Sequence, residues 1–202
     1  SGGLGQGDTT QKLVLQQIAV PSASTPATLV PSFRDTILAH NPVVYLRLGE
    51  TEGTTAVSEV NAPTVNGTYV GPVAKGVASI VADGDTGVRT TNGNYITVPH
   101  STLLNVGDNF TIVFIASLSL LPTFDYITKK AGGNGFPNVR LHSGALQLLG
   151  PNSSAVCEAT DAPGTDFLPH LYMVAKSGSD VLLMVDGVDV TATGDWGPVG
   201  SG

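Results

Sequence analysis

The residues of this chain that could do acid–base chemistry are few, and their spacing argues against a glycosidase. The sequence has four glutamates, at Glu50, Glu52, Glu59 and Glu158. Glycoside hydrolysis needs two carboxyl groups that face one cleft. Glu50 and Glu52 have the two-residue spacing of one strand face, but they follow Gly49 at a predicted strand-to-loop break, and no E-x-D-x-x-E pattern occurs. We therefore predict no carboxylate-pair active site.

The histidines and the cysteine carry no catalytic pattern either. His40, His100, His142 and His170 are isolated, and the sequence contains neither H-E-x-x-H nor G-x-S-x-G. We interpret all four as surface or strand positions. Cys157 is the single cysteine, and no spacing pairs it with a histidine, so we interpret it as a buried structural thiol rather than a nucleophile. The chain is expected not to be an enzyme.

Composition excludes further classes of function. The 202 residues carry 9 Lys and Arg against 16 Asp and Glu, a net charge of −7. Nucleic-acid and anionic-membrane binding need clustered Lys and Arg, so neither partner is expected. The longest apolar run, residues 112–121, is interrupted by two serines and is too short to cross a bilayer.

The elements that must position these residues are mainly short strands. Residues 171–190 hold three apolar runs separated by Ser177–Asp180 and by Asp186-Gly187, and Asp-Gly is a strong hairpin signal. This pattern predicts a three-stranded antiparallel meander. A second hairpin is predicted at residues 139–149 around Ser143-Gly144. The continuous apolar run within residues 109–119 favours a strand buried on both faces.

The start of the chain predicts a different organisation. Residues 1–32 are rich in Gly, Pro, Ser and Thr around one apolar stretch, residues 11–20, which is ambiguous between strand and helix. We interpret residues 1–32 as an extended arm that packs on another subunit, or as a connector between domains. Ser32 can cap a short helix over residues 33–39, and residues 43–49 alternate like a strand.

Several motifs then resemble one known family. Residues 42–56 match P-x-x-Y-x-R-L-G-E-x-x-G-T-x-A, residues 67–71 read G-T-Y-V-G, and residues 185–190 read V-D-G-x-x-V. Together they resemble the laminin-G-like, concanavalin A-like jelly rolls of bacterial and bacteriophage proteins. The resemblance implies an all-β fold of two stacked antiparallel sheets, with a short helix at its start. It covers residues 33–202 and implies that the final strand of the family, expected after Gly202, is missing or supplied by a neighbour.

The resemblance also implies what sites and partners to look for. Many such domains hold calcium, and the best candidate is Asp83 and Asp85, which flank a glycine in a predicted loop; the alternative is that both only cap the turn. Trp196 is the candidate platform for a sugar, and a packed Trp at the sheet edge is the alternative.

The versions of this domain that the chain is most similar to belong to tail proteins of phages with actinobacterial hosts. The expected function is therefore a non-enzymatic structural or adhesion protein of a virion: a minor tail, tail-tip or capsid-decorating protein. Its expected partners are other virion proteins, further copies of itself and host cell-surface glycans. The alternative is a carbohydrate-binding module of a secreted bacterial protein.

Overall fold

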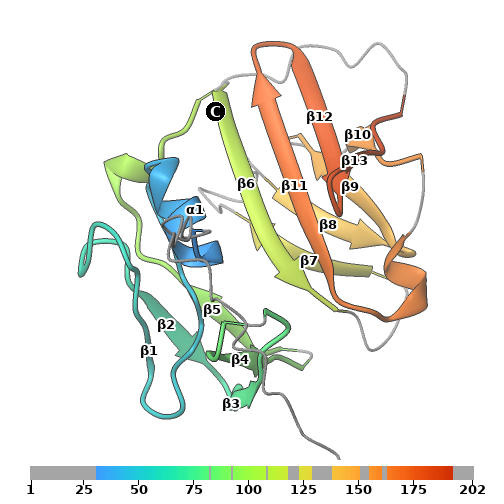
Figure 1. Ribbon diagram of the computed structural model, residues 1–202. Helices are drawn as coiled ribbons and strands as arrows, with labels where there is room; N and C mark the ends of the chain where they lie inside the picture. Colours follow the sequence, from blue (N-terminus) through green and yellow to red (C-terminus); the bar gives the residue numbers. More distant parts are fainter. Residues whose placement is uncertain are drawn as a thin grey trace, which may run out of the picture.

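The structure is a computed structural model that describes residues 31–81, 83–91, 93–107, 109–117, 123–128, 138–150, 155–160 and 163–192. Within these ranges the protein is mostly β, with several antiparallel sheets and one short α-helix (Figure 1). The predicted arm up to residue 30, the predicted sugar platform Trp196 and the chain end where a final strand was expected to be missing lie outside the described residues.

The first part of the chain forms the helix and two small sheets. The helix α1 (Phe33–Ala39) is followed by the strands β1 (Thr55–Ala56), β2 (Gly67–Val70), β3 (Ala74–Ala78), β4 (Thr86–Arg89) and β5 (Tyr95–Thr97), and by the 3-10 turn η1 (Thr102–Leu104). The order in one sheet is β1-β2-β5, and β3 pairs with β4 in the other. Ala56, Tyr69 and Val73 are buried together here, with Leu46 and Ile96 packed against them.

The second part forms two four-stranded sheets. The remaining elements are β6 (Asn109–Ala116), β7 (Thr123–Thr128), β8 (Asn138–His142), β9 (Ala145–Leu149), β10 (Ala155–Glu158), η2 (Pro163–Asp166), β11 (His170–Ser177), β12 (Asp180–Val185) and β13 (Val188–Asp189). One sheet has the order β13-β12-β11-β6 and the other β10-β9-β8-β7. In Figure 1 the first of these sheets lies in front of the second.

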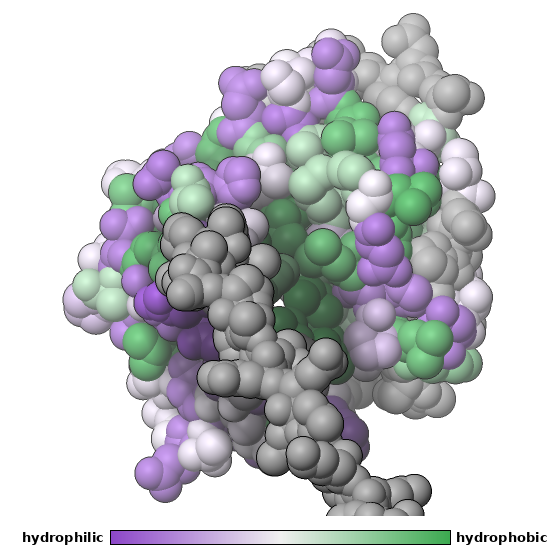
Figure 2. All heavy atoms as spheres, viewed as in Figure 1, coloured by the Kyte–Doolittle hydropathy of each residue, from purple (hydrophilic) through white to green (hydrophobic). Residues whose placement is uncertain are grey.

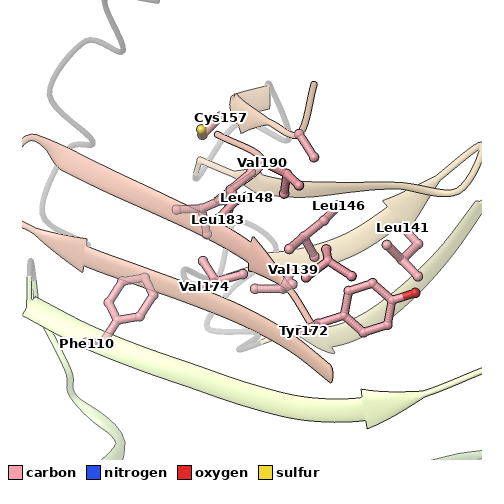
Figure 3. Packing of buried hydrophobic residues seen from close by; sticks show 12 residues of the cluster. Phe110, Val139, Leu141, Leu146, Leu148, Cys157, Tyr172, Val174, Leu183 and Val190 are labelled. Carbon is pink, nitrogen blue, oxygen red and sulfur yellow. The ribbon is translucent and has the colours of Figure 1, made fainter. Parts of the chain in front are cut away.

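The largest hydrophobic core is shared by these two sheets. Phe110, Tyr172, Val174 and Leu183 come from β6, β11 and β12, and they pack with side chains from β8, β9 and β10. The side chains from β8, β9 and β10 are Val139, Leu141, Leu146, Leu148 and Cys157. Figure 3 shows these side chains between the strands of the two sheets. One core enclosed by two antiparallel sheets is compatible with a β-sandwich.

The local predictions for the helix and the two hairpins are confirmed. The Ser32 side chain accepts a hydrogen bond from the Asp35 N–H and caps α1. Asp186 and Gly187 have φ values of 51° and 81°, the left-handed pair that a two-residue hairpin turn requires. The strands β11, β12 and β13 therefore form the predicted meander, and β8 pairs with β9 across the predicted turn.

Two other predictions are wrong. Residues 43–49 do not form a strand, because only Leu46 makes a β-bridge, with Ser58, and Leu48 turns the chain at φ 61°. The strand β6 is buried on one face only. Phe110 is buried in the core, whereas Val113 on the opposite face is 41% exposed. An apolar run alone does not show whether a second layer covers both faces of a strand.

Candidate functional site

The predicted calcium ligands Asp83 and Asp85 lie together, and an arginine lies between them. Arg47 Nη2 is 3.0 Å from Asp83 Oδ2 and 2.8 Å from Asp85 Oδ2. The other guanidinium nitrogen, Nη1, is 3.6 Å from Glu59 Oε1. One cation therefore joins three carboxylates, and we call these four residues the Arg47 cluster.

Local backbone geometry fixes both aspartates. Asp83 Oδ1 accepts a hydrogen bond from the Asp85 N–H at 3.1 Å, and Asp85 Oδ1 accepts one from the Thr86 N–H at 2.9 Å. The Asp85 carboxylate lies directly against Gly49, where a Cβ atom would be 2.1 Å from Asp85 Oδ1. The Thr86 hydroxyl donates to the Gly49 carbonyl at 2.8 Å. An alanine at the glycine of the R-L-G-E motif would therefore displace the Asp85 carboxylate.

The cluster also connects the helix to the rest of the chain. Arg34 of α1 donates to Glu59 Oε2 from Nη2 at 2.6 Å and from Nε at 3.1 Å. The hydrogen bond from Arg34 lowers the pKa of the Glu59 carboxyl. The Asp85 backbone N–H, and after it Arg47, lower the pKa of Asp83. These groups are held in their charged forms at neutral pH, as a salt-bridge network requires.

This geometry weighs against calcium at these two residues. Each oxygen of Asp83 and Asp85 already has a protein partner, either a backbone N–H or the Arg47 guanidinium. Calcium takes six to eight oxygen ligands, and it would have to displace Arg47. Within the part of the chain that the structure describes, no group of three or more His, Cys, Asp or Glu side chains is arranged to hold a metal ion. Calcium binding at Asp83 and Asp85 stays an untested expectation from the sequence, and the ion pairs with Arg47 argue against it.

Glu50 has a structural role. In the sequence it was considered only as one member of a catalytic carboxylate pair with Glu52. Glu50 Oε1 accepts a hydrogen bond from the Val57 N–H at 2.7 Å, and its Oε2 accepts one from the Tyr69 hydroxyl at 2.6 Å. Burial, and then this contact with Glu50, raise the pKa of Tyr69. The carboxylate joins the segment before β1 to the buried Tyr69 of β2, and both of its oxygens have protein partners.

A second polar cluster, which sequence reasoning missed, is centred on His170. Its Nδ1 is 2.6 Å from Asp186 Oδ2, and its Nε2 is 2.9 Å from Asp166 Oδ1. Asp186 also accepts a hydrogen bond from the Leu171 N–H at 2.8 Å. Burial opposes the charging of His170, but the two carboxylates outweigh it and raise its pKa. When it is protonated, the ring donates from both nitrogens, one to each carboxylate.

The His170 cluster connects the end of η2, the start of β11 and the turn that follows β12. Asp166 ends η2, His170 begins β11, and Asp186 is the first residue of the β12–β13 turn. The only signal in the sequence is the Asp-Gly turn, which predicts the hairpin but not the side-chain contact. Because both ring nitrogens have carboxylate partners, this histidine is not placed as a general base toward an external substrate.

Two further side chains with reactive groups are buried in the core. Cys157 is fully buried, as predicted, and burial raises its pKa to about 11, so the thiol stays protonated at neutral pH. Tyr172 is also fully buried, and its ring stacks on Phe114 with centroids 5.1 Å apart. Its hydroxyl has no hydrogen-bond partner among the described residues.

The structure therefore brings Asp83 and Asp85 together, as their positions in one predicted loop indicate. Arg47 lies between them. Trp196 is outside the described residues. No helix within the described ranges is long and apolar enough to cross a membrane. Comparisons with protein-family models, with curated proteins and with solved structures find no match to this chain.

Proposed function

We propose that this chain is a non-enzymatic structural or adhesion protein of a bacteriophage virion. In this proposal it is a minor tail, tail-tip or capsid-decorating protein, and its two four-stranded sheets form a concanavalin A-like jelly-roll sandwich. The motif resemblance of residues 42–56, 67–71 and 185–190 supports the family, and the core shared by two antiparallel sheets supports the architecture.

One observation carries the non-enzymatic part of the proposal. The chemistry-bearing side chains of both polar clusters have protein partners that hold segments of the fold together. Catalysis needs a group that can exchange a proton or bind a substrate. In the Arg47 and His170 clusters the charged side chains stabilise tertiary structure. This is expected of a protein whose function is to bind other molecules.

The test is made on virions. Antibodies against the chain are expected to label purified particles in immunogold electron microscopy, at one fixed location. Particles that lack the gene are expected to be less stable or to adsorb more slowly to host cells. Intact particles that adsorb normally without this polypeptide would refute the proposal.

A glycan array distinguishes the protein-contact and sugar-contact versions of the same function. If a host glycan is the ligand, binding by the full chain is expected to saturate and to be lost in Trp196→Ala. Tyr95→Ala is the matched control, because Tyr95 is an aromatic residue that is 55% exposed and no motif assigns it a ligand. Saturable binding without any association with particles would favour a carbohydrate-binding module of a secreted protein.

A further inference from the structure

The outer face of the sheet β13-β12-β11-β6 is apolar at its centre. Strand residues alternate between two faces, and the neighbours of these residues point into the core. The outward side chains, which we call the outer apolar face, are Val113, Ile115, Leu171, Met173, Ala175, Leu182 and Met184. Met173 is the central residue, because it is paired with Val113 on one side and with Met184 on the other. Each of the seven keeps some exposure to solvent.

Polar residues border this face on two sides. Exposed polar side chains lie at one end of β6, β11 and β12 and on the neighbouring β13: Asn109, Thr111, Ser177, Asp180 and Asp189. No charged residue occurs among the seven central positions. Figure 2 shows hydrophobic residues gathered at the centre of this view, over β6 and β11. An apolar centre with a polar rim is the usual composition of a surface that another segment covers.

The size of the face indicates what kind of segment fits it. Strand spacing and rise give each outward side chain about 33 Å² of sheet, so seven side chains cover about 230 Å². A stable interface between two proteins buries about 800 Å² on each partner. The outer apolar face is therefore small for the centre of a protein–protein interface, and its size suits one short stretch of chain.

The chain itself contains such a stretch. Residues 11–20 (QKLVLQQIAV) include six apolar residues and a single charge, Lys12. The described chain begins at residue 31, just before α1, and α1 is drawn next to β6 in the view of Figure 1. The eleven residues 21–31 can extend to about 36 Å, which exceeds the width of about 14 Å across four strands.

We propose that residues 11–20 of the same chain pack on the outer apolar face. A segment joined by eleven residues to a helix of the same molecule stays close to that molecule's surface, at an effective concentration of about a millimolar. Binding within one molecule is therefore favoured over exchange with a second copy at ordinary protein concentrations. This inference does not depend on the proposed function, since it concerns only how the chain covers its own surface.

Hydrogen–deuterium exchange on the full chain, read by mass spectrometry, tests the proposal. The amides of residues 11–20 are expected to exchange more than about tenfold slower than those of an unstructured peptide of the same sequence. Val113→Glu puts a charge on the outer apolar face, and it is expected to remove this protection. The matched control is Val57→Glu, since Val57 is 49% exposed and lies outside this sheet, and it is expected to keep the protection.

Leu15→Asp makes the reciprocal change in residues 11–20 and leaves the described sheets unaltered in sequence, and it is expected to give the same loss. Exchange of residues 11–20 at free-peptide rates in the unchanged protein would overturn the proposal. Protection that survives both Val113→Glu and Leu15→Asp would also overturn it. Protection that rises with protein concentration, together with a dimer mass in light scattering, would show that residues 11–20 of a second copy cover the face. That result would overturn the intramolecular proposal.

Discussion

Replacing Gly49 tests whether the R-L-G-E motif is used for packing. In Gly49→Ala the new Cβ would lie 2.1 Å from Asp85 Oδ1 and 2.6 Å from Asp85 Cγ, so the carboxylate has to move. Moving it breaks the Arg47–Asp85 ion pair and the hydrogen bond from the Thr86 N–H. Gly87→Ala is the matched control, because its Cβ would meet nothing nearer than Val77 Cγ2 at 3.8 Å.

The magnitude follows from the two contacts that are lost. A partly exposed ion pair contributes about 0.2–1 kcal/mol, and a hydrogen bond contributes about 0.5–1.5 kcal/mol. Both variants lose the same unfolded-state entropy when glycine becomes alanine, so that effect cancels in their difference. We expect the free energy of unfolding of Gly49→Ala to be about 0.7–2.5 kcal/mol lower than that of Gly87→Ala. For a chain of 202 residues the melting temperature is expected to be about 1–10 °C lower.

Urea denaturation followed by circular dichroism measures this difference. Asp85→Ala removes the atoms that the new Cβ meets, so adding Gly49→Ala to Asp85→Ala is expected to cost little more. If Gly49→Ala is as stable as Gly87→Ala, then the close approach of Asp85 to Gly49 does not exist as described. If the two changes add fully, the loss at Gly49 does not arise from the Asp85 contact.

Four further predictions follow from the clusters and the core. Because the folded pKa of His170 is raised, the stability from its carboxylate contacts is complete below its unfolded pKa and is lost as the pH rises through the folded pKa. Thermal melts are expected to show a loss of stability as the pH rises above about 6.5. His170→Gln is expected to reduce this loss, and His142→Gln, a change at an exposed strand histidine, is not. Tyr172→Phe removes a buried hydroxyl without a described partner, so it is expected to change the free energy of unfolding by less than about 1 kcal/mol or to raise it, and a larger loss would reveal a missing partner. Leu146→Ala, at a fully buried position between the sheets, is expected to cost about 3–5 kcal/mol in urea denaturation, and a cost below about 1 kcal/mol would show that the core is elsewhere. Calorimetric titration with calcium is expected to give no heat, because Arg47 occupies the outer oxygens of the two loop aspartates, and a rise in melting temperature that a chelator reverses would contradict this.

The sequence by itself determined the local elements whose signals are contained in a few neighbouring residues. Ser32 caps α1 through a contact three residues away. Asp186-Gly187 and Ser143-Gly144 form the predicted hairpin turns because left-handed backbone is accessible to these residue types. The burial of Cys157 was also predicted, since a lone thiol without a histidine partner behaves as a small apolar side chain.

Tertiary structure alone decided the contacts between distant segments. Arg47 meets Asp83 and Asp85 across 36 and 38 positions, and no periodicity in the sequence signals that meeting. The two carboxylates that were proposed as calcium ligands therefore pair with the guanidinium of Arg47. The same holds for the strand β6, because whether Val113 is buried depends on which layer covers its sheet. Local propensity fixes how the backbone turns, whereas burial and charge pairing depend on which distant residues the fold brings into contact.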